Sequence, residues 1–284
     1  MSSILNKLDG AKDIFSRLLG SKSAVVGMII VGVWFAIMVI SLFGTPYDIE
    51  EFNIMARLQP PSITHPFGTD KFGRDIMSRV MAGSQQVVAI ALTASMLALI
   101  VGATVGLIAG YFGGLIDEIM MRSMDILMSF PGLLLAILVM GMLGPGTYNT
   151  ILVIGIVFSP RVARVCRGAV LEVVTKEFVE AAKSRGASLF HMLFIEITPN
   201  ILGPLGVEFT VRFAYAIFLN ASLGFLGLGV QPPTPDWGLL VNEGRQFITI
   251  APWLVFFPAM SIGTLVVGVN LLSDAVHQLA SGDI

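Results

Sequence analysis

The 284-residue sequence is poor in charged residues, cysteine and histidine. Only 13% of its residues are charged, about half the share found in soluble domains, while 55% are hydrophobic. Its one cysteine, Cys166, excludes an intrachain disulfide and a thiolate metal cluster, and its three histidines share no ligand spacing. The net charge of −2 gives no signature of nucleic-acid binding. The composition therefore predicts a chain built for lipid, with no nucleic acid as partner and no metal site of its own.

The signatures of common enzymes are also missing. The chain has no P-loop pattern (GxxxxGK[ST]), no GxSxG and no HExxH. We therefore expect no catalytic residue and no cofactor bound by this chain. If transport by this protein is energised, the energy must come from a partner.

Long apolar runs are what the sequence has in plenty. Residues 24–43 form an uninterrupted run about as long as a 30 Å hydrocarbon core requires. The run is too long for a signal peptide and no small-residue cleavage site follows it, so we interpret it as a retained span. Five more spans are predicted at residues 85–110, 124–143, 148–166, 201–229 and 251–273. Small residues three to four apart, as close helix packing in membranes requires, are Gly102, Gly106, Gly110 and Gly113.

The segments between the runs complete the predicted organisation. Residues 1–23 are basic and amphipathic, which is typical of a segment lying on a membrane surface. Residues 44–84 form a polar loop, and residues 85–284 a core of five helices. With six spans, about eleven of the 17 Lys and Arg residues fall on the side of the N-terminus, so both termini are predicted to be cytoplasmic and the 44–84 loop periplasmic.

The most distinctive charged stretch is Thr175–Asn200, between the fourth and fifth spans. It reads as two short helices joined at Gly186, a residue suited to the left-handed conformation that ends a helix. Thr175 and Ser188 are the expected caps of the two helices, and Pro199 is expected to close the unit. By itself the stretch fits either a solvated loop or a docking knob for another protein.

Charges inside the spans allow two interpretations. Glu208 and Arg212 stand at i and i+4, a spacing that lets them pair. They either form one internal ion pair or face a water-filled path for a polar solute. Together with Asn220 they are our candidates for such a path, on polarity alone.

Five spaced motifs give the chain a resemblance to a known family. Glu180-Ala181-Ala182, then Gly186, then an apolar residue two before Pro199, is similar to the EAA signature of the permease subunits of binding-protein-dependent ABC importers. Within them the chain more closely resembles the DppC/OppC-like subunit of the dipeptide, oligopeptide and nickel group. The other matching strings are HPFGTDKFGRD at 65–75, RSMD at 122–125 leading to SFP at 129–131, SLGFLGLG at 222–229 with QPPTP and WG, and NLL at 270–272.

The resemblance implies a fold and a set of partners. The fold would be all-α and integral to the bacterial inner membrane, with six transmembrane helices of the type I importer permease fold and a cytoplasmic coupling helix. The function would be passage of di- or oligopeptides, energised by ATPase subunits that dock on the EAA loop at 167–200. Partners would be a second, DppB/OppB-like permease, two DppD/DppF-like ATPases that bind ATP and Mg²⁺, a periplasmic binding protein, and membrane lipid. Nickel, glutathione or another small solute stays open as the cargo, and a secondary carrier acting alone or a membrane scaffold would be a different class.

The resemblance also implies roles for single residues. In the coupling helix, Ala181 and Ala182 would allow close approach to an ATPase, Glu180 and Lys183 would make polar contacts, and Gly186 would set the angle between the two helices. The coupling set is Glu180, Ala181, Ala182, Lys183, Gly186 and Pro199. The periplasmic motif is Gly68, Thr69, Asp70, Gly73, Arg74 and Asp75, expected to be a turn and a helix start with internal ion pairs. Thr198 stands where the family usually has Leu, Ser184-Arg185 where it has Ala-Leu, and the C-terminal tail departs from the usual ending.

Overall fold

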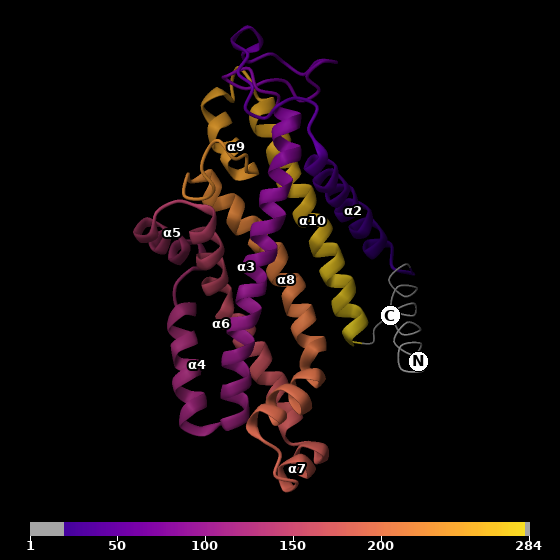
Figure 1. Ribbon diagram of the computed structural model, residues 1–284, viewed down its shortest axis with the longest axis vertical. Helices are drawn as coiled ribbons and strands as arrows, with labels where there is room; N and C mark the ends of the chain where they lie inside the picture. Colours follow the sequence, from indigo (N-terminus) through magenta and orange to yellow (C-terminus); the bar gives the residue numbers. More distant parts are fainter. Residues whose placement is uncertain (1–19, 282–284) are drawn as a thin grey trace. The chain divides into compact units, whose positions relative to one another are not determined.

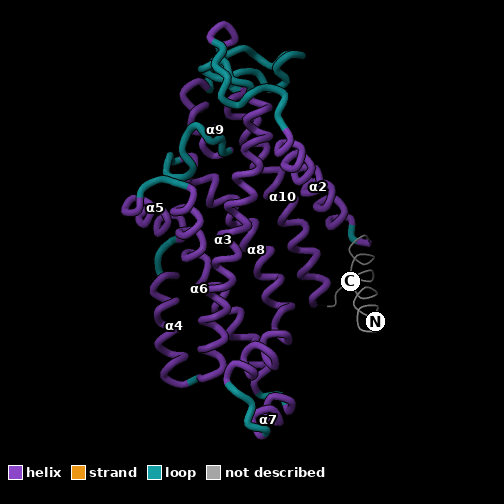
Figure 2. Tube along the Cα trace, viewed as in Figure 1, coloured by secondary structure: helices purple, strands orange, loops and turns teal. Residues whose placement is uncertain are grey.

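The computed structural model describes residues 20–281 of the chain. The predicted amphipathic segment, residues 1–23, lies mostly outside the described residues. Across the described range the chain is helical and has no strand; Thr69 and Asp75 form an isolated bridge in the loop after the first helix (Figure 2). The helices of Figure 1 are α2 (Lys22–Phe43), α3 (Ile76–Phe112), α4 (Gly114–Met128), α5 (Gly132–Leu143), α6 (Thr147–Val174), α7 (Glu177–Ser184), a π-helix (His191–Ile197), α8 (Thr198–Phe225), α9 (Trp237–Gly244) and α10 (Trp253–Ser281).

Within residues 20–281, five helical stretches are long and apolar enough to cross a membrane. They are α2, α3, α6, the continuous stretch His191–Phe225, and Trp253–Gln278 within α10. α4 and α5 pass the same test together but are bent by 88° at the short break between them. Counting this pair as one broken span gives the predicted number of six.

The prediction for the third span and the linker before it was wrong in detail. Residues 111–123, which lie between the predicted spans 85–110 and 124–143, are mostly helix and not an unstructured connection. α3 turns directly into α4 at Gly113 and Gly114, whose φ angles are +64° and +54°. The break comes later, at Ser129–Pro131, inside the predicted span. Pro131 explains the position of the break, because proline disfavours helical geometry in the residue before it.

The predicted polar loop 44–84 was also too long. α3 begins at Ile76, and the Asp75 carboxylate accepts a hydrogen bond from the Ser78 N–H at 2.7 Å, as an N-cap does. The sequence obscured this start because the first turns of α3 are polar. Arg79, for example, is 1% exposed yet faces the carboxylates of Asp70 and Glu243 at 3.3 and 3.2 Å. A charged side chain in the first turns of a helix can be buried at little cost when it is paired with an opposite charge.

Pro199 does not end the segment, contrary to the prediction. The helix runs on from His191 to Phe225, and Thr198 has α-helical angles (φ −53°, ψ −44°). The turn before the proline is the π-helix, and at its end the Thr198 N–H reaches back to the Leu193 carbonyl. In a regular α-helix the proline ring would clash with the carbonyl four residues back. The wider π turn makes room for the ring, so the helix continues.

The chain divides into two compact units. One unit comprises the described part of 1–89 together with 220–281. In it α2 lies alongside α10 (Figure 1), and Gly27 and Gly268 let the two helices approach so closely that a Cβ on Gly27 would lie 2.9 Å from the Gly268 carbonyl oxygen. Trp237 of α9 is fully buried and donates to the Val80 carbonyl of α3 at 2.8 Å. The outer face of α2 exposes Ile29, Phe35 and Phe43, as contact with lipid requires.

The second unit, residues 90–219, contains most of α3 and α8 and all of α4–α7. Here the predicted small-residue packing is confirmed for three glycines of α3. A Cβ on Gly102, Gly106 or Gly110 would come within 2.5–2.8 Å of atoms of α6. Gly113 belongs instead to the turn into α4, where nothing lies within 4 Å of the added atom.

Candidate functional site

The Thr175–Asn200 segment is built on the short helix α7. Its buried face consists of Val179 and Ala182, both 0% exposed, which anchor it to its own unit. Glu177 and Glu180 lie in the first turn, where the helix dipole favours negative charge, and Lys183 lies in the last. Glu180, Ala181 and Lys183 are exposed. Of the coupling residues in α7, Ala182 therefore cannot supply a contact surface, contrary to the role expected for it.

Gly186 ends α7 as predicted. Its φ of +72° is in the left-handed region, where glycine is favoured. The Gly186 N–H bonds to the Lys183 carbonyl at 2.9 Å and the Ala187 N–H to the Ala182 carbonyl at 3.2 Å. This pair of bonds is a Schellman motif, which turns the chain sharply while satisfying the last carbonyls of the helix.

One of the two predicted helix caps is confirmed and the other is wrong. The Ser188 hydroxyl accepts a hydrogen bond from the His191 N–H at 3.3 Å, so Ser188 caps the second helix. Thr175 does not cap the first. It follows the last residue of α6, where its hydroxyl donates to the Glu172 carbonyl at 3.4 Å, and Lys176 occupies the cap position of α7.

Side-chain contacts fasten this segment to its surroundings. The Lys183 ammonium lies over the ring of Tyr111, near the end of α3. Glu196 of the π-helix forms an ion pair with Arg185 at 3.7 Å, and its carboxylate lies 3.3 Å from the Nε2 of His191. These contacts connect the glycine turn to the helix that follows. The segment is therefore held in a defined shape rather than left as a solvated loop.

An exposed apolar surface on the second helix of the segment was missed by the sequence reasoning. Phe190 is 66% exposed, Phe194 51% and Ile195 54%. The rings of Phe190 and Phe194 are in contact, with centroids 4.8 Å apart and planes tilted by 34°. The aromatic pair at i, i+4 in a polar segment was the signal that could have revealed it. Exposed aromatic side chains next to exposed charges are typical of an interaction surface.

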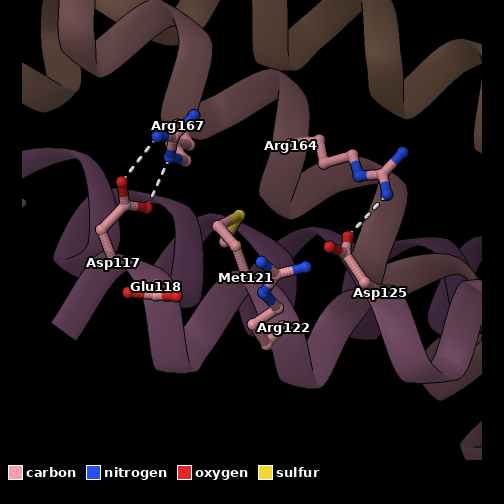
Figure 3. Close-up of a pocket in the computed structure, with 7 residues that line it drawn as sticks. All are labelled: Asp117, Glu118, Met121, Arg122, Asp125, Arg164 and Arg167. Carbon is pink, nitrogen blue, oxygen red and sulfur yellow. Dashed lines mark hydrogen bonds and ion pairs between the residues drawn. The ribbon is translucent and has the colours of Figure 1, made fainter. Parts of the chain in front are cut away.

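A charged pocket lies between α4 and α6 (Figure 3). The cavity has a volume of about 480 Å³ and is open to the surface. Two ion pairs cross it. The Asp117 carboxylate accepts hydrogen bonds from Nε and Nη2 of Arg167, each at 2.5 Å, and the Asp125 carboxylate accepts one from Nη2 of Arg164 at 2.6 Å. Its lining residues are Asp117, Glu118, Met121, Arg122, Asp125, Arg164 and Arg167. The RSMD motif at 122–125 thus contributes both of its charged residues to one pocket.

Glu208 and Arg212 form the predicted ion pair. Arg212 Nε lies 2.8 Å from Glu208 Oε1, one turn away on α8. The Arg212 guanidinium also lies over the rings of Phe158 and Tyr215, at 5.7 and 5.1 Å. Whether the pair faces a solute path stays a prediction.

Asn220 lies elsewhere and makes structural contacts. Its side chain is 0% exposed, and its Nδ2 donates to the Asp236 carboxylate at 2.9 Å. Asp236 in turn caps α9, accepting the N–H groups of Gly238 and Leu239 at 2.9 and 3.2 Å. Asn220 thereby joins the end of α8 to the start of α9, and its place on a solute path stays a prediction.

The 65–75 motif forms the expected turn with internal ion pairs. The Asp70 carboxylate accepts the N–H groups of Phe72 and Arg74 at 2.8 and 2.9 Å and the Arg74 guanidinium at 2.7 Å. Gly73, at φ +79°, passes so close to Asn53 that no side chain fits there. Glu243 of α9 meets both Arg74 and Arg79, at 3.7 and 3.2 Å. The motif therefore fastens the loop to the helix α9.

The Thr69 hydroxyl and Gly68 complete the motif. Thr69 donates to the Ala56 carbonyl and accepts the Gln59 N–H at 2.9 Å. A Cβ on Gly68, at φ +74°, would lie 2.7 Å from the indole nitrogen of Trp253. These contacts give the motif a structural role within its unit.

Comparison with known families and proteins places these features in context. The model of the family described as binding-protein-dependent transport system inner membrane component matches residues 102–281. The model of the N-terminal transmembrane domain of oligopeptide transport permease C matches residues 11–61. Between them the two models cover most of the chain, including the EAA segment and the charged pocket.

Individual relatives match over nearly their whole length. The chain is 42% identical to a dipeptide transport system permease protein DppC of Alkalihalophilus pseudofirmus, over 94% of this chain and 88% of that protein. It is 38% identical to a probable D,D-dipeptide transport system permease protein DdpC of Escherichia coli (96% and 91%). It is 37% identical to a glutathione transport system permease protein GsiD of Pectobacterium atrosepticum (94% and 89%).

A solved structure shares the fold. The inward-facing MetNI methionine ABC transporter contains a chain that matches with a TM-score of 0.57 at 19% identity, covering 74% of this chain and 98% of that one. At this identity the match concerns the fold alone.

Proposed function

Since this chain belongs to the family of inner-membrane components of binding-protein-dependent transport systems, we propose that it passes di- and oligopeptides across the membrane as one of two permeases of an ATP-driven importer. It is a permease of the type I importer fold and not an enzyme. The observation that supports the peptide cargo is its 42% and 38% identity to two dipeptide permeases over almost their full length.

The partners follow from the class of transporter. A permease of an ABC importer works with a second permease, with ATPase subunits and with a binding protein. We propose that the second permease is DppB/OppB-like, that the ATPases are DppD/DppF-like, and that ATP and Mg²⁺ are bound in those ATPases. The binding protein would deliver the peptide from the periplasm.

The Thr175–Asn200 segment is the proposed contact with an ATPase. Its exposed surface combines Glu180 and Lys183 on α7 with the apolar Phe190 and Phe194 on the second helix. An interface of this kind pairs a desolvated aromatic centre with a polar rim. Movement of the ATPases on binding ATP would be transmitted through Gly186 and the π-helix into α8, with which the segment is continuous.

The orientation of the chain is part of the proposal. The excess of Lys and Arg on the side of the EAA segment supports a cytoplasmic position for it and for both termini. The 44–75 loop and its ion-paired motif would then be periplasmic, on the side from which a binding protein arrives.

Glutathione is the second candidate cargo. The 37% identity to a glutathione permease over 94% of the chain is close to the identity to the dipeptide permeases. Glutathione is itself a small peptide, so the same path could serve either molecule.

Reconstitution tests the proposed function. The two permeases and the ATPases are co-purified and placed in proteoliposomes with the binding protein, and uptake of labelled dialanine and glutathione is measured. We expect ATP-dependent uptake of dialanine that requires the binding protein. ATPase subunits that bind ATP but cannot hydrolyse it serve as the control. Equal uptake with these subunits would show a carrier that does not depend on ATP hydrolysis.

A further inference from the structure

The charged pocket between α4 and α6 has a fixed frame. The Asp117–Arg167 and Asp125–Arg164 pairs join the two helices at positions eight residues apart on α4, about 12 Å along its axis. The first pair is bidentate, the arrangement that best fixes an arginine in direction. The frame therefore holds the pocket open without help from the remaining side chains.

Two further charges line the pocket between these pairs. Glu118 and Arg122 are both exposed, and neither forms an ion pair with another residue in the described part of the chain. Figure 3 shows both side chains on α4, without a dashed line to any of the other lining residues. The pocket thus offers one unpaired carboxylate and one unpaired guanidinium.

The spacing of this unpaired carboxylate and guanidinium suits one class of molecule. Four residues on a helix separate Glu118 and Arg122 by about 6 Å along the axis. Two residues of extended peptide span roughly 7 Å, with an ammonium at one end and a carboxylate at the other. The cavity of about 480 Å³ lies within the range of small-molecule sites, roughly 300–1,000 Å³.

We propose that Glu118 and Arg122 form a contact site for the charged termini of a zwitterionic solute the size of a dipeptide, Glu118 holding the ammonium and Arg122 the carboxylate. The proposal rests on the proposed transport function and adds the residues that meet the cargo. The presence of both an unpaired carboxylate and an unpaired guanidinium favours this class over a purely anionic ligand such as a lipid headgroup, because Glu118 would repel an anion at the place where Arg122 attracts it. The carboxylate of the solute and the Arg122 guanidinium match each other's planar, bidentate geometry.

Neutral variants in the full importer test the site. Glu118→Gln and Arg122→Gln are reconstituted with the second permease, the ATPases and the binding protein, and dialanine uptake and ATP hydrolysis are measured in the same vesicles. Each variant should lower uptake about tenfold, the effect of losing one charged hydrogen bond. Hydrolysis stimulated by the loaded binding protein should stay unchanged, because neither residue lies in the coupling segment. Asp274→Asn, an exposed carboxylate of α10 outside both the pocket and the EAA loop, should leave both rates unchanged.

The exchanged double variant provides a second, independent arm. A zwitterion can bind in the reverse direction to Glu118→Arg/Arg122→Glu, so this variant should recover part of the uptake lost by the single variants. Recovery by exchange would not follow from a purely structural role of either residue. Failure to recover, with the complex assembled, would overturn the proposal.

The failures of the two proposals are distinguishable. If the wild-type importer takes up no dialanine, the proposed cargo is wrong and this site falls with it. If the wild type takes up dialanine and both single variants do so within twofold of it, only the site is wrong. Loss of co-purification in either variant would likewise overturn it, since the two residues would then belong to a contact between subunits.

Discussion

Lys183 of α7 and Tyr111 of α3 are in contact, with the Lys183 ammonium 5.4 Å from the centre of the Tyr111 ring. Lys183 belongs to the EAA segment, and Tyr111 lies one residue before the end of a helix of 37 residues. The proposed docking segment is continuous in sequence with α6 and α8, and this contact joins it to a third membrane helix, α3. A force applied to α7 reaches α3 as well as α8.

The Lys183–Tyr111 contact should contribute to docking of the ATPase. A cation–π contact at an exposed site is worth about 0.5–1 kcal/mol, so Tyr111→Ala should weaken ATPase binding about two- to fivefold. Tyr111→Phe keeps the ring and should bind as the wild type does. Titration of the ATPases onto the purified permease pair measures both variants, and equal weakening by Phe and Ala would exclude the ring as the cause.

Close packing of α3 on α6 should depend on Gly106. A Cβ at Gly106 would lie 2.5 Å from the Ala163 carbonyl oxygen and 2.6 Å from the Cys166 Cβ. Gly106→Ala should therefore cost about 1–3 kcal/mol of stability and expose the single, buried Cys166 to thiol reagents. Gly141→Ala in α5 is the matched control, because nothing lies within 4 Å of the added atom. Thermal unfolding and thiol labelling measure both, and an equal response of the two variants would contradict the packing account.

Asp236 should make the stability depend on pH. Burial raises the pKa of its carboxyl, and the hydrogen bonds from Asn220 and from the N–H groups of Leu239 and Gly238 offset this in part. From the ordinary aspartate pKa of about 3.9 up to the raised pKa of the folded protein, the unfolded chain gives up its proton while the folded chain keeps it. Stability from this group is therefore complete at low pH and is lost as the pH rises through that window.

Asp236→Asn tests this dependence. Its side-chain oxygen can still cap α9, and its amide can donate to the Asn220 Oδ1, which has no hydrogen-bond partner within the described residues. The variant should flatten the decline of the unfolding temperature with rising pH. Asp236→Ala also loses the cap and should be about 1 kcal/mol less stable than Asp236→Asn at every pH. An unchanged pH dependence in Asp236→Asn would contradict the assignment to Asp236.

The sequence predicted features that depend on local pattern. The run 24–43 became α2, Gly186 took the left-handed conformation, and Gly102, Gly106 and Gly110 met α6. Hydropathy and glycine chemistry are properties of a few neighbouring residues, so they can be read without knowing the fold.

Features that depend on distant residues could not be predicted in this way. Ala182 is buried because α7 packs with that face against its own unit, and the EAA motif alone does not show which face packs. The polar start of α3 is buried because Glu243, more than 160 residues later, pairs with Arg79. The pocket between α4 and α6 likewise needs Arg164 and Arg167 to face a helix about 40 to 50 residues earlier in the chain.

The central claim, that the EAA segment couples ATP hydrolysis to transport, is tested most directly at Gly186. Nothing lies within 4 Å of an added Cβ there, so a substitution acts through the backbone angle of +72° and not through a clash. Valine in this conformation is strained by about 1–3 kcal/mol, whereas asparagine tolerates it. The measurement is the number of peptides imported per ATP hydrolysed by the reconstituted Gly186→Val and Gly186→Asn importers. If Gly186 couples the two processes, the ratio for Asn is near that of the wild type, and the ratio for Val in an assembled complex is at least about tenfold lower. A wild-type ratio in the assembled Val variant would contradict it.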